Sequence, residues 1–146
     1  MKVEYNNLYT HFIFTTIHRE AIIPEVNRER IEKYITGIVN NNACQLYAIY
    51  ANPEHLHFLV SRSPAIDEEC LASIVADSSA KFINQNNLCK CHFQWQLSCS
   101  AFSVSKADID NVYKYILNQP DHHKKHTFKE EYDAFIKLYQ KTLLPK

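Results

Sequence analysis

The segment His55–Ser61 constrains the fold more strongly than any other part of this 146-residue chain. Its sequence, HLHFLVS, has a period of two, which predicts a β-strand whose successive side chains point to opposite faces of a sheet. One face is apolar, is expected to pack in a core, and carries Leu56, Phe58 and Val60. The opposite face carries His55 and His57, so the strand brings two imidazoles together.

The paired histidines are the first candidate for a functional site. Along a strand, the Cα atoms of His55 and His57 lie about 6.6 Å apart, and two imidazoles leaning together can bind one cation at about 2.1 Å each. Two strand histidines can equally be polar groups on a solvated face, so the pair alone leaves both interpretations open. His11, on an earlier predicted strand, is a weaker candidate because a lone strand histidine is more often structural.

The composition predicts one globular domain spanning residues 1–146. Hydrophobic residues make up 46% of the sequence and aromatic residues 12%, which is enough for a sizeable core. No apolar run approaches the roughly 20 residues of a membrane span, and the N-terminus lacks the apolar stretch of a signal peptide. The five cysteines are scattered, which fits reduced thiols. We therefore expect a cytoplasmic protein with no membrane association.

Periodicity predicts an α+β fold in the order β-α-β-β-α-β, followed by two further helices. The predicted strands cover residues 8–16, 45–52, 55–61 and 93–104, and the last of them can contain an irregular loop at residues 98–100. The predicted helices begin at Pro24, Asp67, Ser105 and Thr127, and they end near residues 42, 85, 120 and 143. This order is typical of a ferredoxin-like antiparallel β-sheet with helices packed on one face, to which the two C-terminal helices are additions.

The third predicted helix carries a second candidate site. At about 100° per residue, an apolar stripe runs along it and comprises Ile109, Val112, Tyr113 and Ile116. Tyr115 lies off the centre of that stripe, and Gln119 follows one turn later on the same side. Tyr113 is therefore predicted to be packed in the core, whereas Tyr115 and Gln119 can face one cleft. From this helix alone, an aromatic residue at the core boundary is the better explanation of Tyr115.

Charge is unevenly distributed although the net charge is zero. Residues 1–80 carry 6 basic and 10 acidic side chains, whereas residues 81–146 carry 10 basic and 6 acidic ones. Basic residues interleaved with aromatic ones suit single-stranded nucleic acid, because charge and base stacking both contribute to binding. An ordinary mixed surface explains the charge pattern equally well. The weak candidates for nucleic-acid contacts are Arg19, Lys81, Lys90, Trp95, Lys106, Lys124 and Lys125.

Taken together, the His-x-His strand and the later Tyr-x-x-x-Gln helix resemble the single-tyrosine HUH transposases of small bacterial insertion sequences, including the REP-associated tyrosine transposases. The resemblance covers nearly the whole chain. Besides Arg19, its matching segments are His11–Thr16, Pro53–Val60, Phe93–Gln96, Ala101–Ser105, Tyr115–Gln119 and His122–Lys125.

The resemblance implies a function and a set of site residues. His55, His57 and Gln119 would hold a divalent cation, Mg²⁺ or Mn²⁺, and Tyr115 would be the nucleophile. The protein would cleave and rejoin single-stranded DNA at hairpin-bearing element ends through a covalent 5′-phosphotyrosine intermediate. Family members are typically homodimers with this ferredoxin-like fold, and each site here is hypothesised to take Tyr115 from the partner's helix.

The residue types suit this chemistry. A cation held by two imidazoles and an amide oxygen keeps positions open for phosphate oxygens, and it acts there as a Lewis acid and a template. The tyrosine hydroxyl, with a pKa near 10, must lose its proton during attack. The phosphotyrosine bond retains the energy of the broken phosphodiester, so a free 3′-OH can reverse the reaction without ATP.

Two alternatives belong to other functional classes. The first is a non-catalytic single-stranded nucleic-acid-binding protein on the same fold; it is favoured by the zero net charge and by Leu97–Ser100, where family members usually carry glycines. The second is a zinc protein built on Cys89, Cys91 and His92, although that spacing is unusual and a fourth ligand is not evident. The complete set of presumed site residues favours the transposase.

Overall fold

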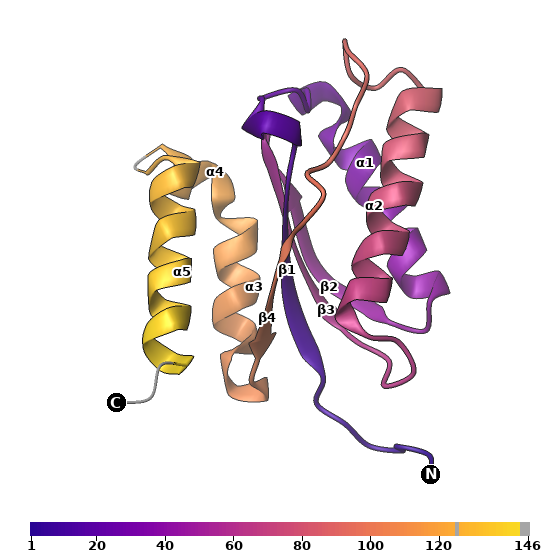
Figure 1. The fold of residues 1–146 in the computed structure, drawn as a ribbon, viewed down its shortest axis with the longest axis vertical. Coiled ribbons are helices and arrows are strands. Elements are labelled where there is room, and N and C mark those ends of the chain that lie inside the picture. Colours follow the sequence, from indigo (N-terminus) through magenta and orange to yellow (C-terminus); the bar gives the residue numbers. More distant parts are fainter. Residues whose placement is uncertain (125, 144–146) are drawn as a thin grey trace.

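The computed structural model describes residues 1–124 and 126–143, which form a four-stranded sheet with helices on both faces (Figure 1). The strands are β1 (Tyr9–Thr15), β2 (Gln45–Ala51), β3 (His55–Ser61) and β4 (Ser100–Val104). The helices are α1 (Arg28–Asn41), α2 (Glu68–Gln85), α3 (Ile109–Leu117), α4 (Gln119–His123) and α5 (Phe128–Leu143). Short 3₁₀ turns cover Ile17–Arg19, Glu25–Asn27 and Lys106–Asp108.

Neighbouring strands of the sheet are antiparallel and follow the order β2-β3-β1-β4. A tight turn joins β2 to β3, and within it the backbone N–H of Asn52 donates to the backbone carbonyl of His55 at 2.7 Å. β3 is therefore a central strand, hydrogen-bonded on both sides. The strand order and directions confirm the predicted α+β class and the ferredoxin-like sheet.

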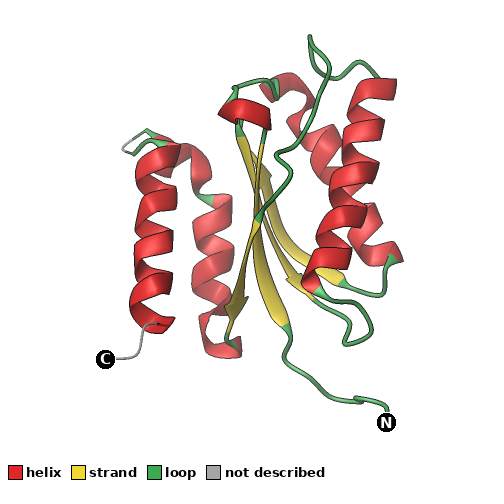
Figure 2. Ribbon diagram, in the orientation of Figure 1, coloured by secondary structure: helices red, strands yellow, loops and turns green. Residues whose placement is uncertain are grey.

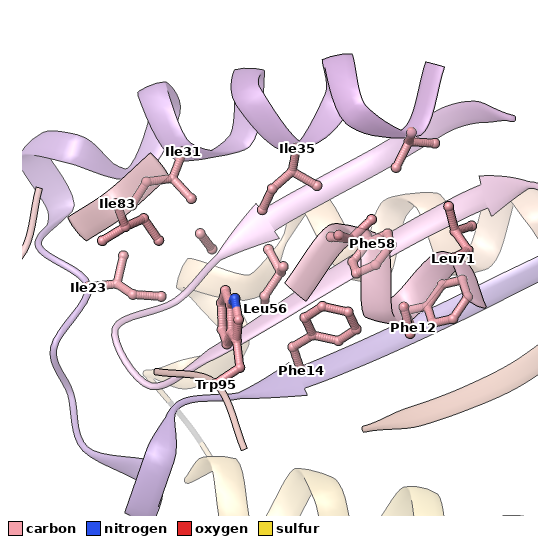
Figure 3. Close-up of a cluster of buried hydrophobic side chains, with 14 of the residues drawn as sticks. Phe12, Phe14, Ile23, Ile31, Ile35, Leu56, Phe58, Leu71, Ile83 and Trp95 are labelled. Atoms are coloured by element: carbon pink, nitrogen blue, oxygen red, sulfur yellow. The ribbon is translucent and has the colours of Figure 1, made fainter. Parts of the chain in front are cut away.

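The main core lies between one face of the sheet and helices α1 and α2 (Figure 2). As the alternation in β3 predicted, Leu56, Phe58 and Val60 point into this core and are fully buried. Figure 3 shows the aromatic centre of the cluster, where the rings of Phe12 and Phe58 stack with centroids 4.9 Å apart. Burial of this apolar area supplies the main driving force for folding.

The opposite face of the sheet is turned toward the C-terminal helices, and in Figure 1 α3 lies next to the sheet with α5 on the far side of α3. A second apolar cluster forms there from Ala48, Leu59, Val104 and Ile116. Because α3 packs on this face, His55 and His57 are fully buried beneath helices. The interpretation of these histidines as polar groups on a solvated face is therefore wrong.

The fourth predicted strand, over residues 93–104, is interrupted at residues 96–99, which partly overlaps the irregular loop expected at residues 98–100. Ser100–Val104 pair with β1 as strand β4, and an isolated bridge joins Thr16 to Trp95 before them. The Asn84 side chain binds both backbone groups of Phe93, with N···O distances of 2.8 and 3.0 Å. These bonds hold the start of the segment against α2, while Gln94 and Gln96 form backbone hydrogen bonds with Ile17 and Thr15 at 2.9 and 2.8 Å.

Two helix boundaries also differ from the prediction. The helix expected to begin at Pro24 starts as the 3₁₀ turn Glu25–Asn27, and α1 follows from Arg28. The helix expected to run to Pro120 stops at Leu117, and α4 restarts at Gln119. Proline fits the first turn of α4 because its missing N–H has no intrahelical acceptor there. In the described part of the chain, every helix is too short or too polar to span a bilayer.

Candidate active site

The two histidines of β3 lie under the first turn of α5. The ring of His55 stacks on Phe128 with centroids 3.8 Å apart and planes inclined by 20°. The rings of His55 and His57 are 5.0 Å apart and nearly perpendicular. Residues separated by more than 70 positions in the sequence thus enclose the imidazole pair on the face of the sheet away from the main core.

A polar partner orients each imidazole. His55 Nδ1 lies 2.7 Å from Glu54 Oε1, and His57 Nδ1 lies 2.9 Å from His11 Nε2. Metal-binding histidines commonly use one ring nitrogen for such a contact and leave the other for the cation. In both residues the inward nitrogen is therefore Nε2. His11, the weaker candidate from the sequence, is a buried partner of His57.

Gln119 reaches the same site through Asn52. The buried Asn52 amide group lies 3.1 Å from His55 Nε2 and donates to Gln119 Oε1 at 3.2 Å. The Gln119 amide also donates to the Tyr115 carbonyl at 3.3 Å, which ties α4 to the end of α3. The amide oxygen of Gln119 is thus linked to His55 through the side chain of Asn52.

Tyr115 points into the site from α3. Its ring centroid lies 5.7 Å from that of His57, and its hydroxyl donates to a Glu131 carboxylate oxygen. Burial raises the pKa of the Tyr115 hydroxyl, and the hydrogen bond to the Glu131 carboxylate raises it further, well above its usual range. The hydroxyl is therefore protonated in this arrangement.

The prediction about Tyr113 is wrong. Its side chain is 42% exposed, whereas Tyr115 packs against the cluster around Leu59 and Ile116. Both tyrosines flank the Ile109–Ile116 stripe, on opposite edges. The sheet contacts the edge that carries Tyr115, so this residue faces the site because it lies on the packed side of α3.

Glu131 is the site residue that the sequence reasoning missed. It lies in the first turns of α5 with a side chain only 2% exposed, and its Oε1 is 2.8 Å from His57 Nε2. Burial raises the pKa of a carboxyl group, but here the hydrogen bonds from His57 and Tyr115 outweigh burial and lower the pKa of Glu131 to about 2. One signal was present, because Glu131 follows Phe128 by three residues and so shares its helix face.

The donor atoms of His55, His57 and Glu131 all lie within 4.8 Å of one another. Imidazole nitrogens and carboxylate oxygens in this number suit a divalent transition metal. Among the described residues, Cys89, Cys91 and His92 form no such group, so the zinc alternative lacks a converging ligand set.

The comparison with known families decides the class of protein. Residues 4–119 match the family described as "Transposase IS200 like". The chain belongs to this transposase family. The enzyme class predicted from the sequence, a DNA transposase with a tyrosine nucleophile, is thereby confirmed. No curated protein matches the chain significantly.

Two solved structures share the fold. A candidate transposase from Deinococcus radiodurans R1 is 20% identical with a TM-score of 0.60, and the alignment covers 82% of this chain and 96% of that one. A REP-associated tyrosine transposase bound to a REP hairpin is 16% identical with a TM-score of 0.61, covering 84% of this chain and 74% of that one. At sequence identities of 20% and 16%, the two comparisons show that the fold is shared.

The predicted nucleic-acid contacts are spread over the transposase. Arg19 is exposed beside the site, with its guanidinium carbon 5.6 Å from the ring centroids of both Phe128 and Tyr132. The exposed side chains of Lys90, Lys106 and Lys124 are available to a ligand, and Lys124 lies 3.7 Å from Asp121. Lys81 is also exposed but sits on α2, across the sheet from the histidines. Lys125 lies outside the described residues.

Trp95 is placed differently from the prediction. Its side chain is buried in the main core, and its indole N–H donates to Ser79 Oγ at 2.9 Å. The ring packs edge-on against Phe14 and Phe93, with centroid separations of 5.5 and 4.7 Å. Since only 7% of the residue is exposed, Trp95 supports the core in place of the predicted contact with DNA.

An open groove of about 730 Å³ adjoins Trp95 on the α2 side of the sheet. The side chains of Glu69 and Asp77 contribute to its lining, together with loop residues 94–99. Two acidic groups disfavour a polyanion, and the sheet separates this groove from the histidines. The groove is therefore not part of the candidate active site.

The buried position of Trp95 makes a spectroscopic prediction. Because it is the only tryptophan of the protein, its fluorescence reports on this residue alone. We expect saturation with a single-stranded oligonucleotide to leave the emission wavelength and intensity unchanged. Unfolding in guanidinium should shift the emission to the red and serves as the positive control. Strong quenching on DNA binding would show that the indole stacks on a base.

The buried contact between His11 and His57 leads to a prediction about pH. Burial, and to a smaller extent the neighbouring His57, lower the pKa of His11 from an ordinary 6.5 to about 3. Below pH 6.5 the unfolded chain therefore binds a proton at His11 that the folded chain does not bind. The free energy of unfolding should fall by about 1 kcal/mol for each pH unit of acidification below pH 6 on account of this residue.

The measurement is urea unfolding in metal-free buffer from pH 7 to pH 5. We expect His11→Gln to lose less stability than the wild type over this interval, because glutamine does not titrate. The two proteins share all other titrating groups, so the difference between their slopes isolates His11. Parallel slopes would mean that His11 keeps an ordinary pKa in the folded protein.

Proposed function

We propose that this transposase cleaves and rejoins single-stranded DNA through a covalent 5′-phosphotyrosine intermediate at Tyr115. The observation that carries the proposal is the convergence of the Tyr115 hydroxyl with the inward nitrogens of His55 and His57 in one buried site. A structural neighbour, the REP-associated tyrosine transposase, is bound to a REP hairpin. We infer hairpin-bearing element ends as the substrate class here. A cytoplasmic location remains the prediction from the sequence.

The donor set fits a divalent cation. His55, His57 and Gln119 would hold it, because two oriented imidazoles and a buried amide oxygen lie at one site. We propose Mg²⁺ or Mn²⁺, and the two nitrogen ligands favour Mn²⁺. When bound, such a cation polarises a phosphate oxygen and fixes the orientation of the scissile phosphate.

The covalent step leaves the phosphate on the protein. The Tyr115 oxygen forms a bond to phosphorus, the bond from phosphorus to the 3′ oxygen breaks, and the departing strand takes a proton to leave a free 3′-OH. The Tyr115 hydroxyl already donates to Glu131, which is the acceptor placed nearest to its proton. Attack by a 3′-OH on the phosphotyrosine reverses these changes and rejoins a strand.

DNA is expected to approach across Arg19. Its exposed guanidinium lies beside the aromatic rings at the start of α5, close to the imidazole pair. An arginine there can pair with a phosphate of the strand that leads into the site. Lys106 and Lys124 are proposed as further phosphate contacts, on the same side of the sheet as α3 and α5.

Replacing Tyr115 by phenylalanine should abolish covalent chemistry. The change removes one oxygen and keeps nearly all the apolar area, so folding should be little affected, but no phosphotyrosine can form. Tyr113→Phe is the matched control, because Tyr113 lies two residues away on the exposed side of α3. The assay incubates a labelled single-stranded element end with Mn²⁺ and resolves protein–DNA adducts on a denaturing gel.

The control should keep most of the adduct. An adduct that persists in Tyr115→Phe and disappears in Tyr113→Phe would assign the nucleophile to the other tyrosine. If the wild-type protein binds every plausible element end and leaves it intact, the non-catalytic nucleic-acid-binding alternative holds.

We propose that the transposase acts as a homodimer, on the basis of its resemblance to dimeric family members. Supply of Tyr115 by the partner's helix was the hypothesis from the sequence. The distance of 5.7 Å between the Tyr115 and His57 rings within one chain supports attack within a protomer instead.

Mixing the two inactive variants His57→Ala and Tyr115→Phe separates these arrangements. If each site is built within one chain, freshly mixed heterodimers contain no complete site and should give no adduct. Recovered cleavage would show that Tyr115 acts across the dimer. Light scattering of the mixture with DNA verifies that dimers form, and a monomer under these conditions would contradict the homodimer.

A further inference from the structure

We propose that Glu131, on the C-terminal helix α5, is a ligand of the same cation as His55 and His57. The proposal rests on the proposed function, because it assumes that the histidines bind a divalent cation. It adds a carboxylate to the ligand set inferred from the sequence. It also makes completion of the site depend on a helix that follows the family-matched residues 4–119.

The separation of the donor atoms fits a shared cation. Two ligands at right angles on a cation, each about 2.1 Å from it, are about 3.0 Å apart. His57 Nε2 and Glu131 Oε1 are 2.8 Å apart, and all three donors lie within 4.8 Å of one another. Small side-chain adjustments therefore suffice for one ion to contact all three.

The tautomer of His57 can adapt to a cation. Without one, His57 Nε2 carries the proton that Glu131 accepts, and Nδ1 accepts from His11. With His57 Nε2 bound to a cation, Nδ1 carries the proton and donates to His11 Nε2. The 2.9 Å contact between the two imidazoles serves both states, because each ring nitrogen can donate or accept.

Several contacts hold Glu131 at this position. Phe128, one turn earlier in α5, stacks on His55, and the guanidinium of Arg19 lies 5.6 Å from the ring centroids of both Phe128 and Tyr132. The Tyr132 hydroxyl forms a hydrogen bond with Ser100 Oγ on β4. α5 is thus attached to the sheet on either side of Glu131 in the sequence, and its carboxylate is directed at the imidazoles.

The ligand chemistry indicates the class of ion. Two imidazoles with one carboxylate form the set that binds divalent first-row transition metals with positions left open for other ligands. A buried carboxylate is costly unless positive charge compensates it, and a divalent cation supplies that charge. Mn²⁺ is therefore expected to bind more tightly than Mg²⁺, which prefers oxygen ligands and retains its waters.

The test is calorimetric titration of the full-length protein with Mn²⁺ in the absence of DNA. Glu131→Gln keeps the size of the side chain and removes the charge, and we expect Mn²⁺ affinity to fall about tenfold or more. Glu130→Gln is the matched control, because Glu130 is the adjacent acid of α5 with a side chain 63% exposed, and its affinity should match the wild type. His57→Ala should bind no Mn²⁺, and Gln119→Leu should bind it more weakly.

Circular dichroism of each metal-free variant verifies folding. Unchanged Mn²⁺ affinity in Glu131→Gln, together with loss of binding in His57→Ala, would overturn the role of Glu131 and leave the proposed function intact. Unchanged affinity with increased adduct formation would show instead that α5 covers the site and is displaced by DNA. If the wild type binds no Mn²⁺ with or without oligonucleotide, both the cation and this proposal fail, while the Tyr115 adduct remains separately testable.

Discussion

The structure depends on burial of both faces of the central strand β3. Six of its seven residues are buried. One face is buried by apolar packing, whereas the other buries polar groups that need hydrogen-bond partners. The apolar face packs against α1 and α2. The other face buries two imidazoles, whose polar nitrogens must be paired because water no longer reaches them. His11, Glu54 and Asn52 supply those contacts from the neighbouring strand β1 and the β2–β3 turn, and Glu131 adds one from α5.

Local sequence pattern predicts part of this arrangement. Period-two alternation in β3 correctly separated the core residues from the histidines, and the order of elements predicted the sheet. The strand expected over residues 93–104 is interrupted just before β4, near the irregular loop expected at residues 98–100, and periodicity does not reveal that Asn84 of α2 binds the backbone of Phe93. The edge of α3 that meets the sheet was likewise misassigned. A helical stripe has two edges, and only packing selects the one with Tyr115 over the one with Tyr113.

The candidate site shows the same limit. His55, His57, Tyr115 and Gln119 were found because their spacing resembles a family motif. Glu131 is on α5, 12 residues beyond the end of the family match, and it meets His57 only after α5 folds back over the sheet. An acid at a helical position is ordinarily a solvated surface residue, so the sequence carries no strong sign that this one is buried. Its role depends on tertiary contacts between distant elements.

The site keeps the hydroxyl of its proposed nucleophile, Tyr115, protonated. The Tyr115 hydroxyl and His57 Nε2 share one carboxylate oxygen, and the pKa values of tyrosine and carboxyl group are displaced in opposite directions. The proton therefore stays on Tyr115 in the absence of added positive charge. A cation that engages Glu131 weakens the hold of this carboxylate on the hydroxyl and, by Coulomb attraction, favours the phenolate. The same ligand that completes the ion site would thus couple ion binding to release of the tyrosine for attack.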